Sequence, residues 1–572
     1  MVMFTPICLQ AVLAALAIAQ TTPLTGRHTE LPRWCGKPYK KDSPNFDPGG
    51  QLYPPPSQPN KQIYLQVAPK HSIYVDSETT AEFIVDAELS KLHGKPLGKG
   101  KPSGTLYFEI RQDSVQNALV SDKVAVGTMG TTFKFDLAQL KPKMDPYTII
   151  ISAGPTPGDK TFVATTELYY LPAKTTGSMV KIDNLNGGML LANKVSKFAF
   201  EPILPFGMYT SCSGWLTSKA NAQRYKDFGY TMIHPVCAFT DGDLSDMFNW
   251  MDDMNMPYQY DMRGSYYDLK SVAEQVPRIK DRDSFLSWYT ADEPDGWQYA
   301  FKSTDSAYEY LKRVDPYHPV GLVLNCQNYY FDRYSAGADY IMEDAYPIGI
   351  NPKFCPEWGT NCNSTYGDCG CDNCVGALHD VSDRLDDFRK YQTWLGRRQK
   401  PLWTVPQAFH SGPYWSRDPS PGETWAMNLL GFNHGSKGVM SWIFPASDTL
   451  NKAHGDMSKV FAAAPVRDFL LGSNPLPLKI SGNPSLDVAY WKLGNQIMVG
   501  LVNQDLGKST ASSVRLPFRG YSVASQPWGS LKWSSVMCGL KVEVPSGVTT
   551  SVVILTKRSK AEDQTLLDEC SE

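Results

Sequence analysis

The chain has 572 residues, which is too long for a single hydrophobic core and predicts roughly three or four domains, or fewer if one is a barrel. Its hydrophobic content of 42% and charged content of 20% are ordinary for a globular protein. The net charge is −3, so no global positive field draws the chain to nucleic acid or to an anionic membrane. The aromatic content of 12% suits a glycan binder, because the C–H faces of sugars stack on Trp and Tyr, although large cores use the same residues.

Residues 1–19 are typical of a secretory signal peptide. The segment Ala11–Ala19 is apolar but too short to span a bilayer, and it ends in the small-residue cleavage pattern Ala17-Ile18-Ala19. No later segment is long and apolar enough for a membrane helix, and residues 559–572 form a polar tail. We therefore expect a secreted, extracellular protein with no membrane partner.

The cysteines also suit an oxidising compartment. Five of the 12 crowd into one loop: Cys355, Cys362, Cys369, Cys371 and Cys374. Without a second spaced pair or a nearby paired His, this cluster favours disulfides over a metal or redox motif, with the connectivity left open. Removal of Cys8 with the signal peptide leaves an odd number, which predicts a free thiol or an external partner. The glycosylation sequon at Asn363 predicts that the loop lies at the surface.

The regions before and after residues 205–472 are predicted to form an extended segment and two β-domains. Residues 20–60 are rich in Pro, Gly and Lys and predict a tether or a strap over the surface, with Cys35 as a candidate pin. Short alternating strands over 61–172 predict an immunoglobulin-like antiparallel β-sandwich, followed by a linker at 173–204. The strand pattern returns over 473–558 and predicts a small C-terminal β-domain, of the kind that braces a barrel or, less often, binds glycan.

Strands and helices alternate over residues 205–472. The predicted strands are Phe206–Cys212, Tyr230–Cys237, Pro257–Arg263, Phe285–Asp292, Pro319–Cys326, Asp339–Tyr346, Pro401–Phe409 and Lys437–Phe444. Helix-period segments lie between most of them, so this multidomain α/β and all-β chain is predicted to hold a central (β/α)8 TIM barrel. A doubly wound sheet is the alternative. No Gly-rich phosphate loop stands at a strand–helix turn, which counts against a nucleotide fold.

Catalytic groups of a barrel lie at the C-terminal ends of its strands. In strand order, the polar and aromatic residues at these ends are Tyr209, Ser211, His234, Asp261, Arg263, Asp292, Glu293, Asn325, Gln327, Glu343, Asp344, Tyr346, Gln407, His410 and Trp442. Cleavage of a glycosidic bond needs two carboxyl groups, one as a proton donor and one as a nucleophile or base. Two acid-bearing ends opposite each other, together with aromatic rings, therefore indicate carbohydrate chemistry.

Glu293 is the candidate general acid, because the adjacent Asp292 raises the pKa of one member of the acidic pair. Asp344 is the preferred second carboxylate, since it shares a strand face with Tyr346 by period two. The other options are Glu343, Asp261 and, within the acidic pair, Asp292 itself. For each candidate for the second carboxylate, a structural role as the charge partner of an arginine explains the residue about as well as a catalytic role does.

The candidate substrate contacts are His234, Arg263, Tyr209, Tyr346, Gln407 and Trp442. His234 either binds a sugar hydroxyl or is a structural group. Arg263 either clamps a substrate carboxylate or pairs with Asp261. Trp442 is either the floor of a sugar subsite or part of the core. We expect no cofactor and no metal, and a monomer whose partner is a polysaccharide or oligosaccharide substrate.

The block Ala291-Asp292-Glu293-Pro294 resembles the Asn-Glu-Pro block of clan A glycoside hydrolases, with Asp292 where Asn usually stands. Trp442 is similar to the strand-eight Trp that often lines the first subsite in that clan. The resemblance covers roughly residues 205–472 and implies a barrel with Glu293 as its acid/base. It also implies a nucleophile Glu at the end of strand seven, where this chain has Gln407. Asp344 or Glu343 takes over that role, water is used by an inverting enzyme, or catalysis is lost.

The preferred hypothesis is a secreted hydrolase of O-glycosidic bonds in an extracellular or cell-wall polysaccharide. The alternative is a catalytically inactive barrel that acts as a glycan-binding or wall-associated protein, and a transglycosylase would use the same residues as a hydrolase. The separation of Glu293 from Asp344 discriminates among these hypotheses. A distance of about 5–5.5 Å suits retention and about 6.5–9.5 Å suits inversion. Carboxylates on opposite faces of the barrel wall favour the inactive protein.

Overall fold

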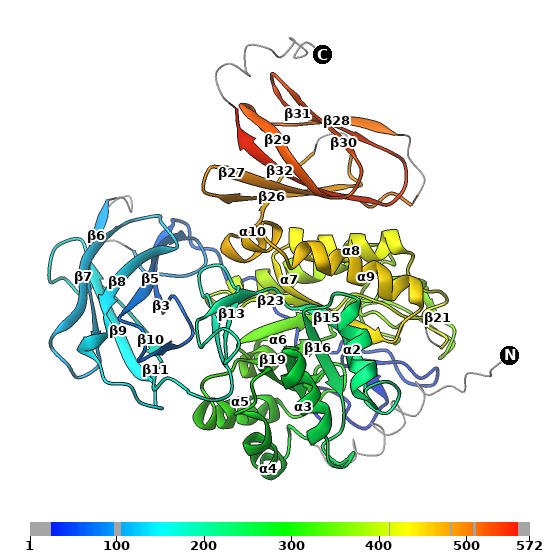
Figure 1. Cartoon of the computed structure of the whole chain (residues 1–572), viewed down its shortest axis with the longest axis horizontal. Coiled ribbons are helices and arrows are strands. Elements are labelled where there is room, and N and C mark those ends of the chain that lie inside the picture. The colour runs from blue at the N-terminus through cyan, green and yellow to red at the C-terminus, as the bar shows by residue number, and fades with distance from the viewer. Residues whose placement is uncertain (1–23, 97–103, 411, 481–482, 507–510, 559–572) are drawn as a thin grey trace.

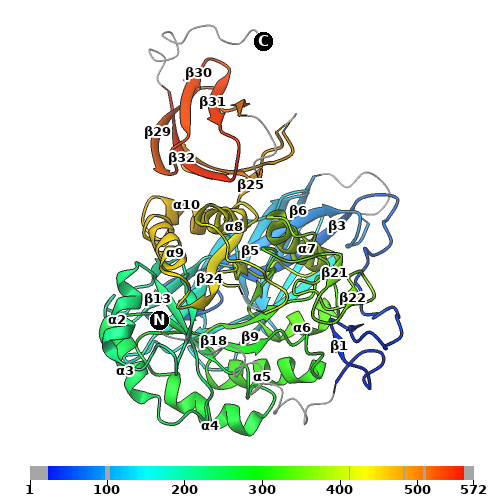
Figure 2. The same cartoon turned by 90° about the vertical axis from the view of Figure 1, so that its right-hand side faces the viewer.

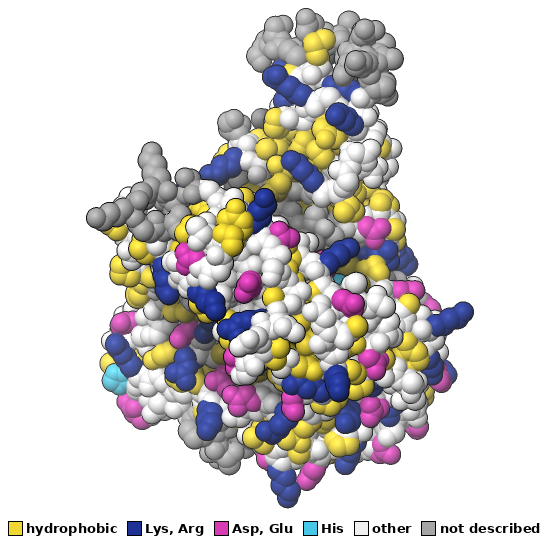
Figure 3. Space-filling model, turned by 90° about the vertical axis from the view of Figure 1, so that its left-hand side faces the viewer, with side chains coloured by type: hydrophobic (Ala, Val, Ile, Leu, Met, Phe, Trp, Pro, Cys, Tyr) yellow, Lys and Arg dark blue, Asp and Glu magenta, His cyan; other side chains and the backbone are white. Residues whose placement is uncertain are grey.

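The computed structural model describes residues 24–96, 104–410, 412–480, 483–506 and 511–558. The predicted signal peptide and the polar tail at 559–572 lie outside these ranges. Figure 1 shows the barrel between two β-domains, with the N-terminal sandwich on its left and the C-terminal domain above it. On the face drawn in Figure 3, acidic and basic side chains are interspersed, so that face presents no field of a single sign.

Eight parallel strands close into a barrel, so the predicted TIM barrel is confirmed. Its strands are β15 (Phe206–Ser211), β16 (Met232–Val236), β17 (Tyr258–Asp261), β18 (Phe285–Asp292), β19 (Val320–Leu324), β20 (Tyr340–Glu343), β23 (Leu402–Thr404) and β24 (Ser436–Phe444). Each overlaps one predicted strand. The pairing of β24 with β15 closes the ring. The C-terminal ends of β18 and β20 are therefore held on the same rim.

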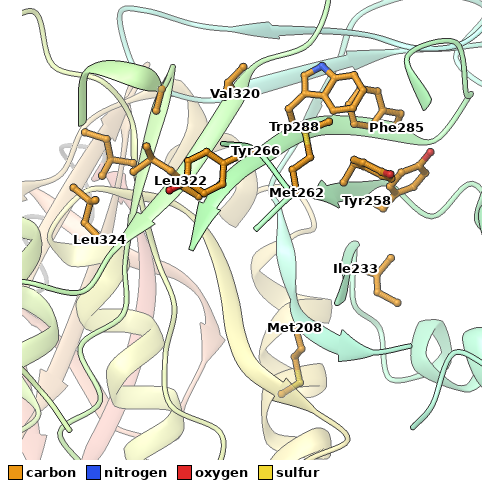
Figure 4. Close-up of a cluster of buried hydrophobic side chains, with 14 of the residues drawn as sticks. Met208, Ile233, Tyr258, Met262, Tyr266, Phe285, Trp288, Val320, Leu322 and Leu324 are labelled. Atoms are coloured by element: carbon orange, nitrogen blue, oxygen red, sulfur yellow. The ribbon is translucent and has the colours of Figure 1, made fainter. Parts of the chain in front are cut away.

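Helices surround the barrel. They are α2 (Lys219–Asp227), α3 (Ser245–Met254), α4 (Leu269–Ile279), α5 (Phe301–Val314), α6 (Phe331–Tyr334), α7 (His379–Trp394), α8 (Pro421–Asn433), α9 (Asp448–Phe461) and α10 (Val466–Gly472). Their apolar faces pack on the outward side chains of the strands, such as Ile233, Tyr258 and Trp288 in Figure 4. Local signals fix several helix starts; α8, for example, begins with a capping box between Ser420 and Glu423.

A small sheet closes the barrel at the end opposite the candidate site. It consists of β12 (Met179–Ile182), β13 (Met189–Ala192) and β14 (Glu201–Ile203). Val180 shares one apolar cluster with the barrel-filling side chains, and its N–H donates to the Tyr317 carbonyl just before β19 (3.0 Å). The expected linker at 173–204 is therefore a folded cap. Strands of four residues or fewer are too short to give a readable period, which explains the difference.

The N-terminal β-domain has two antiparallel sheets over one core. One contains β3 (Gln62–Pro69), β5 (Thr80–Ser90) and β8 (Thr131–Asp136); the other contains β6 (Thr105–Gln112), β7 (Ala118–Ala125), β9 (Tyr147–Gly154) and β10 (Phe162–Leu168). Alternate side chains such as Phe83, Ile110 and Ile151 are buried between them. A short pair, β4 (Tyr74–Val75) and β11 (Tyr170–Leu171), runs parallel at its edge. The immunoglobulin-like topology stays a prediction.

The C-terminal domain is also all-β and packs on the barrel helices. Its strands are β25 (Leu476–Pro477), β26 (Leu486–Leu493), β27 (Gln496–Asn503), β28 (Ser512–Leu516), β29 (Tyr521–Trp528), β30 (Lys532–Val536), β31 (Gly539–Val544) and β32 (Thr549–Lys557). Trp491 and Ile554 are buried in one cluster with Leu429 and Met427 of α8. The domain therefore shares a core with the barrel, as a bracing element would.

The N-terminal strap, residues 24–60, contacts the loops that follow β18 and β19. It is the dark-blue segment at the right of Figure 2. It contains β1 (Arg33–Trp34) and β2 (Lys37–Pro38). A disulfide joins Cys35 to Cys326, and the Lys37 ammonium forms a buried ion pair with Asp372 (2.6 Å). The strap is thus fixed to the rim of the barrel at several points.

Four disulfides occur in the described residues: Cys35–Cys326, Cys212–Cys237, Cys362–Cys369 and Cys371–Cys374. The Cys-rich loop, with β21 (Phe354–Cys355) and β22 (Thr360–Asn361), holds two of them, while Cys355 and Cys538 are free thiols. Asn363 is exposed in this loop, as its sequon predicts. In the described part of the chain, no helix is long and apolar enough to cross a membrane.

Gly207 lies where the first two barrel strands, β15 and β16, approach each other closely. A Cβ there would lie 1.9 Å from the Met232 carbonyl oxygen of β16. Gly207→Ala should therefore lower the free energy of unfolding by about 1–3 kcal/mol, because a packed core does not absorb an added methyl without moving backbone. The control is Gly422→Ala in the first turn of α8, where the nearest atom would be 3.6 Å away. Urea unfolding measures both variants, and equal stability would contradict this account of the packing.

Candidate active site

The structure brings Glu293 and Asp344 together at the rim of the barrel. Glu293 follows β18, and Asp344 follows β20. The Asn325 side-chain amide, just after β19, donates to Glu293 Oε1 (3.0 Å) and to Asp344 Oδ1 (3.2 Å). The two carboxyl groups also lie within hydrogen-bonding reach of each other. The two acids preferred from the sequence therefore form one unit, and a hydrogen bond between carboxyl groups requires that one of them carries a proton.

The backbone at Glu293 is unusual. Its φ of 48° lies in the left-handed region, which non-glycine residues enter at a cost and most often at functional sites. Pro294 ends the strand, and the following turn is closed by the Trp297 N–H, which donates to the Glu293 carbonyl (3.0 Å). The Glu293 N–H remains bonded to the Val323 carbonyl of β19 (3.2 Å). This turn directs the carboxyl group of Glu293 toward Asn325 and Asp344.

The surroundings of Glu293 and Asp344 give the two carboxyl groups different pKa values. Burial, the Asp344 charge and the neighbouring Asp292 and Asp295 raise the pKa of Glu293 well above its ordinary value. Burial also raises the pKa of Asp344, to about 6, but hydrogen bonds from Glu293 and Asn325 limit the rise. Asp344 therefore ionises first while Glu293 keeps its proton. This is the division of roles that an acid and its partner carboxylate require.

Arg263 links the other acids of the rim. Its Nη1 donates to Asp292 Oδ2 (2.8 Å) and its Nε donates to Asp261 Oδ2 (2.6 Å). His234 Nε2 also contacts Asp261 Oδ2 (3.0 Å). Burial raises the pKa of Asp261, but the Arg263 charge and the His234 contact outweigh burial and leave that pKa lowered. Asp261 is therefore a charge partner, and His234 and Arg263 are bound to protein groups in this network.

Two residues proposed for the site are held by the barrel wall instead. Glu343 accepts hydrogen bonds from the Thr404 hydroxyl of β23 and from the Ala345 N–H (2.9 Å). Burial raises its pKa to about 7. The Gln407 amide donates to the Ile348 and Phe409 carbonyls and accepts from the Ile348 N–H (2.9 Å). Gln407 is fully buried, and both ends of its side-chain amide are hydrogen-bonded to backbone groups. No pattern in the sequence indicated these bonds.

Aromatic rings line the rest of the rim. Trp442 is partly exposed, with its ring centroid 5.2 Å from that of Tyr209 and the Arg263 guanidinium 5.2 Å from its centre. Tyr209 is almost fully buried and donates to the Tyr289 hydroxyl (3.1 Å). Tyr346 packs edge-on against Phe409. Trp442 is thus the best placed of these rings to meet a substrate, whereas Tyr209 supports it from below.

Sequence reasoning missed two important groups. Asp295 is buried and accepts from the N–H groups of Gly296 (2.9 Å), Asn325 (3.2 Å) and Cys326 (2.9 Å), so it ties the Glu293 turn to the end of β19. Burial raises its pKa to about 7. Its position next to the Asp-Glu-Pro block was the available signal. Trp34 of the strap donates to Asn325 Oδ1 (2.9 Å), a contact across 291 residues that no local pattern reveals.

One group of potential metal ligands lies close together in the described residues: Cys35, Cys326 and Asp372. The two sulfur atoms form a disulfide, so they are not thiolate ligands. The Asp372 carboxylate accepts from the Lys37 ammonium (2.6 Å) and the Gln327 N–H (2.9 Å). This group anchors the strap to the rim.

No family model matches the chain, and no curated protein matches its sequence. Similar solved structures include an FMN-binding beta-glucuronidase from Facaelibacterium prausnitzii L2-6, with 10% identity over 87% of this chain and 72% of that chain and a TM-score of 0.33. A glycoside hydrolase family 30 subfamily 8 xylanase from Clostridium acetobutylicum has 10% identity over 62% and 96%, with a TM-score of 0.39. The Parabacteroides merdae beta-glucuronidase has 9% identity over 87% and 74%, with a TM-score of 0.29. These neighbours are glycoside hydrolases. The barrel rests on its own strand pairing and the site on its own contacts.

Proposed function

We propose that this protein is a glycoside hydrolase that cleaves O-glycosidic bonds of an extracellular or cell-wall polysaccharide, with Glu293 as general acid and Asp344 as the second carboxylate. The observation that carries the proposal is the hydrogen-bonded Glu293–Asp344 pair under the Asn325 amide. Two carboxyl groups with separated pKa values on one rim supply the proton donor and the anionic partner that glycosidic cleavage needs. Trp442 lies on the same rim and offers a surface for a sugar ring.

The direct contact between the two carboxyl groups favours a retaining reaction. Inversion needs room for a water molecule between the second carboxylate and the sugar, and the carboxyl groups of such enzymes stand about 6.5–9.5 Å apart. A pair in hydrogen-bond contact is nearer to the spacing of about 5–5.5 Å that suits retention. Asp344 then attacks the anomeric carbon as Glu293 protonates the leaving oxygen. Glu293 next deprotonates the water that releases the sugar from Asp344.

An inactive glycan-binding barrel is the second candidate, and the amide at Gln407 is the feature that favours it. The close acid pair, with Asp344 buried and Glu293 partly buried, weighs against this candidate. Holding two carboxyl groups in contact in a partly dry site is costly, and a binding cleft needs no such pair. Secretion is part of the proposal because the signal-like residues 1–19, the disulfides and the exposed sequon at Asn363 suit an extracellular protein. We expect the enzyme to act as a monomer.

Removal of either carboxyl group should abolish turnover without unfolding the protein. A screen of polysaccharides and aryl glycosides first identifies a cleaved substrate. Glu293→Gln should then lower kcat by about 10²–10⁴-fold, the usual contribution of a positioned general acid. Asp344→Asn should lower it at least as much, and the exposed Glu201→Gln should have no effect. Full activity of Glu293→Gln on the same substrate would contradict the assignment.

The dependence of kcat/KM on pH should be bell-shaped. Asp344 must be ionised, so activity should rise as the pH rises through about 6, the raised pKa of this group. Glu293 must be protonated, so activity should fall only above its higher pKa, and the two limbs belong to the coupled pair. Initial rates from pH 4 to 9 test this expectation. A maximum of kcat/KM below pH 5, followed by a fall as the pH rises toward 6, would show that Glu293 does not keep its proton as described.

A further inference from the structure

Trp34 of the N-terminal strap contacts the residue that holds the acid pair. Its indole Nε1–H donates to Asn325 Oδ1 (2.9 Å). A carboxamide has one acceptor end and one donor end. With Oδ1 engaged by Trp34, Nδ2 faces Glu293 and Asp344 at 3.0 and 3.2 Å. Trp34 therefore fixes which end of Asn325 meets the two carboxyl groups.

The surroundings of Trp34 are built to hold it there. The residues that follow Trp34 and Asn325 are joined by the Cys35–Cys326 disulfide. The Cys35 N–H donates to the Gly296 carbonyl (3.4 Å), and a Cβ on Gly296 would lie 2.5 Å from Trp34 Cζ2. The Trp297 ring packs edge-on against Trp34 at 5.0 Å. The strap, the Glu293 turn and the end of β19 thus interlock around one indole ring.

We propose that Trp34 is a positioning residue for the acid pair: by holding the Asn325 amide, it keeps a donor on both carboxyl groups and so decides which of them carries the proton. Its consequence for catalysis rests on the function proposed above, whereas the arrangement itself does not. Without the indole N–H, the Asn325 amide can turn its oxygen toward the pair. An ionised Asp344 then loses a donor and meets a negative dipole, so its pKa rises.

The other groups that act on the pair do not change when Trp34 is replaced. The pair interacts with charged or titratable groups from several elements around the rim: Asp292 at the end of β18, Asp295 after it, Arg384 of α7, Tyr346 after β20 and Tyr209 of β15. None of them forms a hydrogen bond with the Trp34 indole in the described structure. A change in titration caused by Trp34→Phe therefore reports on Asn325.

A direct contact with substrate is the competing role for Trp34. The residue also lines a pocket of about 170 Å³ between the strap and the Cys-rich loop, together with Lys37, Asn363 and Asp368. A substrate platform would change KM and leave the titration of the pair untouched. A positioning residue would move the titration whether or not substrate is present.

The test is Trp34→Phe, which keeps a ring against Gly296 and removes the N–H. The Asp344 carboxyl is followed by NMR in protein labelled with ¹³C-carboxyl aspartate and assigned by Asp344→Asn, so no substrate is needed. Its titration should move up by about one pH unit or more, the equivalent of one hydrogen bond to a charged group. The acidic limb of kcat/KM should move with it. The control is Trp358→Phe, which removes an indole N–H that donates to the Tyr414 hydroxyl and keeps a ring under Lys40 of the strap, and it should titrate as wild type.

A double-mutant cycle with Asn325→Ala then identifies the path. If Trp34 acts through Asn325, Trp34→Phe has no further effect on the titration in the Asn325→Ala background. Unchanged titration in Trp34→Phe, a change in KM alone, or additive effects of the two substitutions would each overturn the proposal. Because the NMR titration needs no turnover, a wild-type protein that cleaves no glycan would contradict the proposed function and leave this test intact.

Discussion

The structure of the site depends on the close approach of two carboxyl groups at the rim of the barrel, that of the partly buried Glu293 and that of the buried Asp344. The Asn325 amide donates to both carboxyl groups, and a proton on one of them would remove the repulsion between two charges. Two ionised carboxylates at this separation would repel strongly in a partly dry site. Three features keep this pair and its donor in place. They are the strained turn at Glu293, the hydrogen bonds from the Asn325 and Cys326 N–H groups to Asp295, and the strap.

The barrel supplies the framework on which this pair is built. Parallel pairing brings the ends of β18, β19 and β20 side by side, so Glu293, Asn325 and Asp344 meet at one rim of the barrel. The small sheet β12–β14 seals the opposite end, and the C-terminal domain shares a core with α8. Rigid support of this kind matters because catalytic geometry tolerates only small displacements.

Much of this arrangement follows from the sequence. The buried run that ends at Pro294 predicts a strand that stops beside Glu293, and period two selects Asp344 over Glu343, which the structure holds against Thr404. Other features had no readable signal. The strands of the 173–204 cap are too short to show a period. The Gln407 side-chain amide is hydrogen-bonded to backbone groups, and Trp34 donates to Asn325, which is far away in the sequence. No local pattern encodes either contact.

The most direct test of the central claim is to trap the covalent intermediate. The protein is incubated with a 2-deoxy-2-fluoro glycoside of the sugar that it cleaves, which slows release of the glycosyl group, and is then digested and analysed by mass spectrometry. The account predicts one added glycosyl group on the peptide that contains Asp344, and none after Asp344→Asn. Turnover with inverted product and no adduct, or an adduct on another carboxylate such as Asp261, would contradict it.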